Sequence, residues 1–133
     1  MVSISTLNTT ELQAALEGVA LDASPTAQAV SAGHVHEPAA NTAAVVTLVA
    51  PAAGVSNVVG LVVYSYDGAP AAGSLTITDD GTVVFKVDIV ASGVGALSFV
   101  PPLKFTAATA TVVTLAAGGG AVSGIVNVHA WTE

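Results

Sequence analysis

Short runs of β-branched residues, separated by glycine, proline and aspartate, dominate the chain from Ala43 onward. Apolar and polar residues alternate along several of these runs, which is the period of a half-buried β-strand. The connecting segments are too short for the crossover helices that a parallel sheet needs. We therefore predict an all-β fold, an antiparallel β-sandwich or barrel, with strands at Ala43–Val49, Asn57–Tyr66, Ser74–Thr78, Thr82–Val90, Ala96–Val100, Thr109–Leu115 and Val122–Trp131.

The turn at Asp79-Asp80-Gly81 joins two of these strands, and its length decides which side chains face the core. A two-residue turn would place Leu75 opposite Lys86. A three-residue loop instead places Leu75 opposite Phe85, which keeps the core face apolar. We predict the three-residue loop, with Gly81 in a left-handed backbone conformation.

Other strands are apolar on both faces. Within Asn57–Tyr66, apolar residues stand next to one another at Val58-Val59 and at Leu61-Val62-Val63. We expect this strand to be covered on both sides, the second face meeting the N-terminal arm, another sheet or a neighbouring subunit. Pro101-Pro102 cannot donate to a ladder, so we expect this pair at a strand end or on an edge strand.

The first 41 residues differ in composition from the strand-rich part. They hold four carboxylates, neither Lys nor Arg, and few large apolar side chains. We predict two regions, an extended N-terminal arm at 1–41 and a β-sandwich domain at 42–133. Within the arm, the cap residues Asn8–Glu11, followed by Leu12 and Leu16 and ended by Gly18, predict a two-turn helix.

Charged residues are scarce. They make up 8% of the chain against 53% hydrophobic residues, whereas a soluble domain ordinarily has about 25% charged residues. With two Lys, no Arg and nine carboxylates, the chain has few ions to cover a free surface. We expect part of that surface to be buried against other subunits. The net charge of −7 argues against nucleic-acid binding, which draws on clustered Lys and Arg.

Cysteine is absent, so no disulfide, thiolate metal site or thiol nucleophile can form. Met1–Thr10 has neither a basic n-region nor an apolar h-region, so we expect no secretory signal and synthesis in the cytoplasm. The charge-free stretches Pro38–Tyr66 and Phe105–Thr132 are broken by proline and glycine, and neither fits a membrane-spanning helix. We expect no membrane partner.

The cluster His34-Val35-His36-Glu37 is the nearest approach to a metal site, because alternate residues of a strand point to the same side. A metal ion would need further ligands, and His129 is the remaining histidine. We expect a structural or solvent-exposed role for His34 and His36, in the arm.

Acidic and glycine-rich motifs have conformational explanations. Asp79 and Asp80 precede Gly81, and Asp67 precedes Gly68, as turn residues do. Gly118–Gly120 lacks the strand, helix and lysine of a phosphate-binding loop and is predicted to be a turn. No serine or threonine forms a recognisable triad with a histidine and a carboxylate. We predict no catalytic, cofactor-binding or metal-binding residues and a protein that is not an enzyme.

Aromatic residues make up 5% of the chain, and Tyr64, Tyr66 and Trp131 are the candidates for a carbohydrate-stacking platform. Strand alternation puts Trp131 on one face with His129 and Asn127, directed outward or toward a subunit contact. Buried aromatic anchors are common in cores and interfaces, so we favour a core or contact role over sugar binding.

Several stretches between Val59 and Val128 carry a family resemblance. They are Leu61–Gly68, Gly73–Ile77, Val87–Ile89, Phe99–Lys104 and the glycine-rich turn before Gly124. This part of the chain resembles small virion proteins of tailed phages. Those proteins are typically jelly-roll or related β-sandwich proteins that decorate or cement the capsid, commonly as trimers.

The resemblance implies a capsid decoration or cement protein that stabilises the head as a homo-oligomer, with a trimer expected. It implies the major capsid protein as partner and the capsid surface of the virion as location, after synthesis in the host cytoplasm. We expect the N-terminal arm to act as the tether. Strand spacing alone leaves the plain sandwich and the jelly roll open.

An alternative function is a receptor-binding or fibre-tip module that recognises host glycans through Tyr64, Tyr66 or Trp131. A bacterial surface or pilus-like adhesion module is a third hypothesis, for which a secretory signal would be expected.

Overall fold

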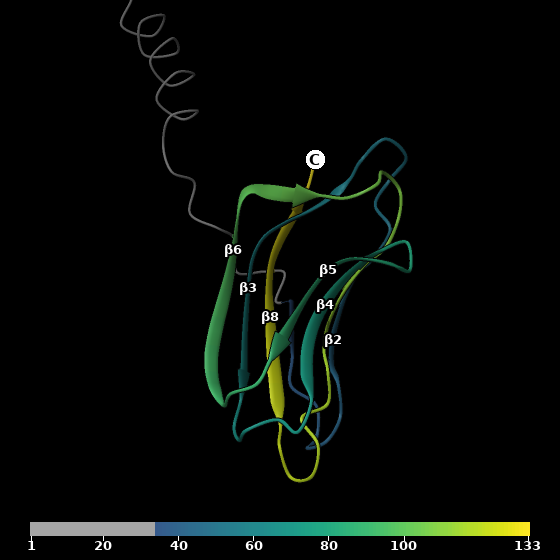
Figure 1. Ribbon diagram of the computed structural model, residues 1–133. Helices are drawn as coiled ribbons and strands as arrows, with labels where there is room; N and C mark the ends of the chain where they lie inside the picture. Colours follow the sequence, from purple (N-terminus) through teal and green to yellow (C-terminus); the bar gives the residue numbers. More distant parts are fainter. Residues whose placement is uncertain (1–33) are drawn as a thin grey trace, which may run out of the picture. The chain divides into compact units, whose positions relative to one another are not determined.

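The protein, as a computed structural model that describes residues 34–133, consists of two four-stranded antiparallel sheets (Figure 1). The predicted all-β sandwich is confirmed. The predicted helix and the arm up to residue 33 lie outside the described residues. The strands are β1 (His34–His36), β2 (Ala44–Leu48), β3 (Asn57–Tyr66), β4 (Gly73–Asp79), β5 (Thr82–Ile89), β6 (Gly93–Lys104), β7 (Thr111–Leu115) and β8 (Gly124–Thr132).

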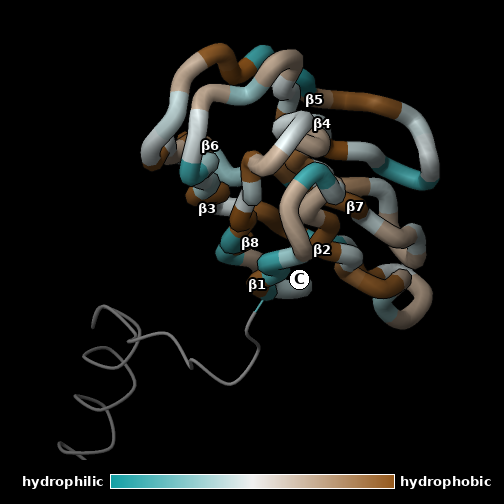
Figure 2. Tube along the Cα trace, turned by 90° about the horizontal axis from the view of Figure 1, so that it is seen from below, coloured by the Kyte–Doolittle hydropathy of each residue, from teal (hydrophilic) through white to brown (hydrophobic). Residues whose placement is uncertain are grey.

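The strand order is that of a jelly roll. Sheet A runs β1-β8-β3-β6 and sheet B runs β2-β7-β4-β5, which Figure 2 shows as two layers. Ladders join β1 to β8, β2 to β7, β3 to β6 and β4 to β5, as in one long antiparallel ribbon folded in half. The β3–β8 and β4–β7 ladders then close each sheet. Eight strands in this double Greek-key order define the jelly roll.

The core lies between the two sheets and is built by alternate residues of the strands. Leu75 and Ile77 of β4 and Val126 of β8 are fully buried there. Phe85 of β5 meets Phe99 of β6 edge to face across the sheets, with ring centroids 5.2 Å apart. Apolar packing of this kind holds the domain together in the absence of disulfides.

All seven predicted strands are present, and β3 begins and ends where predicted. The prediction was wrong at β1. His34–His36, which we placed in the arm, pair with residues 126–128 of β8 and so belong to sheet A. The sandwich therefore includes residues before the predicted boundary at 42. Three residues without a hydrophobic run give too little pattern to predict a strand.

The β4–β5 hairpin differs from the prediction in register. Asp79 ends β4, so the loop has two residues, Asp80-Gly81, whose φ angles of 47° and 81° suit a type I′ turn. A bulge at Val84 of β5, just after the turn, then moves the register by one residue and places Leu75 opposite Val87, not Phe85. Leu75 and Phe85 both face the core as predicted, because the bulge restores the apolar face. The predicted pairs are wrong, and Val83, which the three-residue loop would place opposite Ile77 on the core face, lies opposite Thr78 on the outer face.

Strand β6 carries Pro101-Pro102 and lies at the edge of sheet A, which confirms the predicted position of this pair. Residues 99–102 of β6 stand opposite the single residue Gly60 of β3. The peptide bond before Pro101 is cis. Beyond this bulge β6 turns across the end of the sandwich (Figure 1).

Candidate functional site

The outer face of sheet A is the most distinctive surface of the described residues. Val126 and Val128 of β8 face the core, so the residues between and beside them face outward. The ladders set the outward residues of β1, β3 and β6 beside them. We call this surface the sheet-A face; it consists of Val35, Leu61, Val63, Ser65, Val94, Ala96, Ser98, Ile125, Asn127, His129 and Trp131.

The sheet-A face is mostly apolar, with Ser65, Ser98, Asn127 and His129 as its polar residues, and it contains no aspartate, glutamate or lysine. Val94 is 78% exposed and Val35 is 55% exposed at its two edges. At one end the register places Lys104 opposite Val58, and the Lys104 Nζ lies 3.2 Å from Glu133 Oε1. An apolar centre with an ionic rim is the usual composition of a protein–protein interface. Strand β3 has apolar residues on both faces, and the expectation that its outer face is covered stays a prediction.

Trp131 forms the raised end of the sheet-A face. Its ring lies over Gly60, where an added Cβ would stand 2.9 Å from Trp131 Cζ3. The His129 ring meets the indole edge-on, with ring centroids 6.0 Å apart. The indole is still 38% exposed. Trp131 therefore faces outward with His129, as predicted, and offers an aromatic surface to a partner.

The outer face of sheet B has different chemistry. Thr76 and Thr114 stand directly opposite each other at its centre. Lys86 and Asp88 project from β5, with Nζ and Oδ1 4.0 Å apart. We call this surface the sheet-B face; it consists of Val45, Thr47, Ser74, Thr76, Thr78, Val83, Lys86, Asp88, Val112 and Thr114.

The histidines do not converge. His34 and His36 share one side of β1, as predicted, whereas His129 lies on the opposite, outer side of sheet A. His36 Nδ1 accepts a hydrogen bond of 2.8 Å from the backbone N–H of Val45. Since Val45 lies on edge strand β2 of sheet B, this bond links the two sheets. Within residues 34–133, no three metal-binding side chains come together.

The three candidate aromatic residues do not share a surface, so they form no common platform for a sugar. Tyr66 is 2% exposed, and its hydroxyl donates to the backbone carbonyl of Ala116. Burial raises the pKa of Tyr66. Tyr64 packs against the core over Gly95 of β6. The predicted core role is thus confirmed for the tyrosines, and Trp131 alone faces outward.

The acidic residues shape turns and loops. Asp79 accepts hydrogen bonds from the Thr106 hydroxyl at 2.6 Å, the Thr106 backbone N–H at 3.0 Å and the Thr109 hydroxyl at 2.8 Å. Partial desolvation raises the pKa of Asp79, but the hydrogen bonds from Thr106 and Thr109 outweigh it and leave the pKa lowered. Asp67 Oδ1 accepts from the Ser123 backbone N–H at 2.7 Å. The predicted conformational role of these residues is confirmed.

The predicted turn at Gly118–Gly120 is also confirmed. Gly119 and Gly120 have φ angles of 84° and 53°. The Val122 backbone N–H donates to the carbonyl of Gly119 at 3.0 Å and closes the turn.

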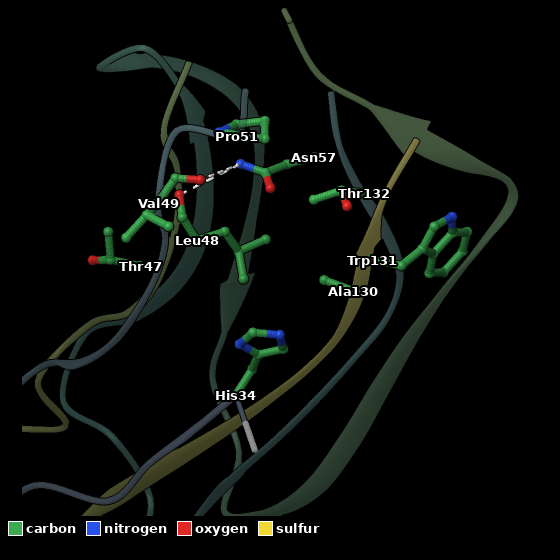
Figure 3. A pocket seen from close by; sticks show the side chains of 9 residues that line it. All are labelled: His34, Thr47, Leu48, Val49, Pro51, Asn57, Ala130, Trp131 and Thr132. Atoms are coloured by element: carbon green, nitrogen blue, oxygen red, sulfur yellow. Dashed lines mark hydrogen bonds between the residues drawn. The ribbon is translucent and has the colours of Figure 1, made fainter. Parts of the chain in front are cut away.

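A cavity of about 230 Å³ opens where β1, β2 and β8 meet (Figure 3). Asn57, 4% exposed, donates from Nδ2 to the carbonyls of Val49 at 3.1 Å and Thr109 at 3.2 Å. This amide is thus engaged in holding the loops, and among the described residues that line the cavity His34 is the one titratable group. The walls come from residues far apart in sequence, so no local pattern predicts them. They are His34, Thr47, Leu48, Val49, Pro51, Asn57, Ala130, Trp131 and Thr132.

No protein-family model and no curated protein sequence matches this chain. The resemblance to phage virion proteins therefore stays a prediction. In the part of the chain that the structure describes, no helix is long and apolar enough to cross a membrane. The two charge-free stretches that raised this question contain β2 and β3, and β7 and β8.

Proposed function

We propose that the protein is a phage virion structural protein of the capsid decoration or cement type. It binds the major capsid protein at the capsid surface as a homo-oligomer and so stabilises the head. The observation that carries this proposal is an uncharged sheet-A face on a jelly-roll body. Jelly rolls recur in viral capsid proteins, but a fold alone defines no function, so the composition of the face carries more weight.

The described residues supply what such a role needs. The two sheets pack against each other and form a rigid body. The sheet-A face supplies apolar area for contact with a neighbouring subunit. A protein that binds only the assembled shell stabilises it by mass action, because its binding free energy must be overcome before the shell subunits separate. Binding to the shell, without any reaction, is therefore sufficient for the proposed function.

The test is binding to phage heads that lack this protein. The purified chain is mixed with such heads and pelleted, and the bound copies per head are counted. We expect saturable binding at a ratio fixed by the shell symmetry, together with a higher temperature of DNA release. Heads that bind none of the protein at micromolar concentration would overturn the proposal.

The second candidate function is recognition of host surface glycans. One observation favours it, the outward indole of Trp131, 38% exposed on the sheet-A face. Jelly rolls also occur in lectin domains, and aromatic faces stack on sugars. Glycan-array binding that disappears in Trp131→Ala, with no binding to heads, would support this function over capsid decoration.

A further inference from the structure

All charged side chains of residues 34–133 lie outside the sheet-A face. The carboxylates are Glu37, Asp67, Asp79, Asp80, Asp88 and Glu133, and the lysines are Lys86 and Lys104. The sheet-B face carries two of them, and the turns and the rim of sheet A carry the rest. Among the described residues, this partition leaves one broad surface without carboxylates or lysines, on a chain whose net charge is −7.

The extent of the sheet-A face suits a weak, reversible contact. Strands β3 and β8 run along its full length, whereas β1 contributes three residues and β6 contributes Gly93–Ser98, before its bulge. At about 3.3 Å per residue and about 4.8 Å per strand, the face covers roughly 450 Å². Two such faces in contact bury about 900 Å² in total, which is below the range of stable interfaces and within that of transient ones, so we expect reversible association in the micromolar range.

We propose that the sheet-A face is an interface between two copies of this chain, packed face to face about a two-fold axis. Each copy then contributes the same patch to the contact, so the assembly ends at two copies and needs no other interface. Stacked sheets pack about 10 Å apart through interdigitated apolar side chains, which Leu61, Val63 and Ile125 supply. The expected species is a dimer, in place of the trimer that the family resemblance implies.

Charge favours a second copy as the occupant. Two copies with a net charge of −7 repel each other wherever their carboxylates approach, and the sheet-A face is where they can meet without such contacts. The ion pair between Lys104 and Glu133 then lies at the rim, where it stays hydrated. Added salt screens the remaining long-range repulsion and strengthens the dimer. A contact made by opposite charges would weaken instead.

Sedimentation velocity of the full chain, from 1 to 200 μM at low and high salt, measures this equilibrium. Val94→Glu puts a carboxylate on the sheet-A face of each copy, at a side chain that is 78% exposed. The matched control is Val84→Glu on edge strand β5 of sheet B, where the side chain is 52% exposed. We expect Val94→Glu to weaken the dimer at least tenfold and Val84→Glu to change its Kd by less than twofold. Ser98→Glu repeats the test at a second position of β6, and circular dichroism verifies that each variant is folded.

A monomer throughout this range would overturn the proposal, as would equal effects of Val94→Glu and Val84→Glu. A dimer that weakens as salt is added would also overturn it. Phage heads are absent from this assay, so its outcome is independent of the proposed role on the capsid. If the wild-type chain is monomeric but binds heads, and Val94→Glu abolishes that binding, the face serves the shell and not a second copy.

Discussion

The two outer faces of the sandwich obey the same geometry but differ in chemistry. Each belongs to a four-stranded antiparallel sheet whose other side fills the core. The sheet-B face presents mainly threonines and the Lys86–Asp88 pair, with Val45, Val83 and Val112 among them. The sheet-A face presents mainly valine, leucine, isoleucine and tryptophan, and its polar residues are serine, asparagine and histidine, without aspartate, glutamate or lysine. Because the fold needs only the inward residues to be apolar, folding alone does not account for the difference between the two outer faces.

Replacement of Gly95 by alanine is expected to have the largest effect on stability. It tests the assignment of alternate residues to the core side and the outer side of sheet A. Tyr64 lies across Gly95 on the core side, and an added Cβ would stand 2.2 Å from the Tyr64 ring. We expect Gly95→Ala to lower the free energy of unfolding by about 3 kcal/mol, measured by urea denaturation. Ser98→Ala, outward on the same strand, is the control and should cost less than about 0.5 kcal/mol. Equal costs would contradict the assignment.

Truncation of Trp131 comes next and compares the two outer faces directly. The indole covers Gly60 and is 38% exposed, so Trp131→Ala removes part of the packing of a large ring. We expect a loss of about 2 kcal/mol in the free energy of unfolding, below the cost at a fully buried site. Thr114→Val on the sheet-B face keeps the side-chain shape and should change stability by less than about 0.5 kcal/mol. A cost for Trp131→Ala no larger than this control would mean that the ring is not packed on sheet A.

The pH dependence of Asp79, which ends strand β4 of sheet B, gives a smaller effect. Its pKa is lowered in the folded state, so its contribution is present above the ordinary value near 3.9 and is lost as pH falls through the folded-state pKa. With allowance for solvent screening, we expect Asp79→Asn to cost about 1 kcal/mol at pH 7. The cost should shrink as the pH falls below 3.9. Asp80→Asn in the adjacent turn is the control, and a pH-independent cost at Asp79 would refute the assignment.

The smallest effect concerns the bond that links the edges of the two sheets. His36→Ala removes the acceptor for the Val45 backbone N–H, but water can replace it at this exposed position. We expect a loss of about 0.5 kcal/mol. Hydrogen exchange is the sharper measurement: the Val45 amide should exchange faster in His36→Ala, while the Val46 amide keeps its rate. Unchanged exchange at Val45 would show that the bond does not protect this edge.

Strand positions were predictable from the sequence because each long strand repeats its pattern many times. Strand β3 offers ten residues of pattern, whereas β1 offers three, two of them histidines. The register of the β4–β5 hairpin was not predictable, because its bulge leaves no mark on the order of apolar residues. The jelly-roll order depends on pairs such as His34 with Val128, which local patterns do not encode.

The candidate site was predictable in part. The sequence alone indicated an apolar outer surface on sheet A. Strand β3 has apolar residues on both faces, and strand alternation directs Trp131 outward. The sequence could not reveal which residues these rings pack on. The Tyr64 ring lies over Gly95, and the Trp131 ring lies over Gly60. Which glycine faces which ring follows only from the register between strands.

The position of β8 in sheet A also determines when the domain can complete its folding during synthesis. Strand β8 lies between β1 and β3, although it is the last of the eight strands to leave the ribosome. Until then β1 has no partner strand in sheet A, β3 can pair only with β6, and the sheet lacks its central ladder. Since non-local strand pairing is slow, completion of the domain waits for one nine-residue insertion, and any chain truncated before Gly124 stays open.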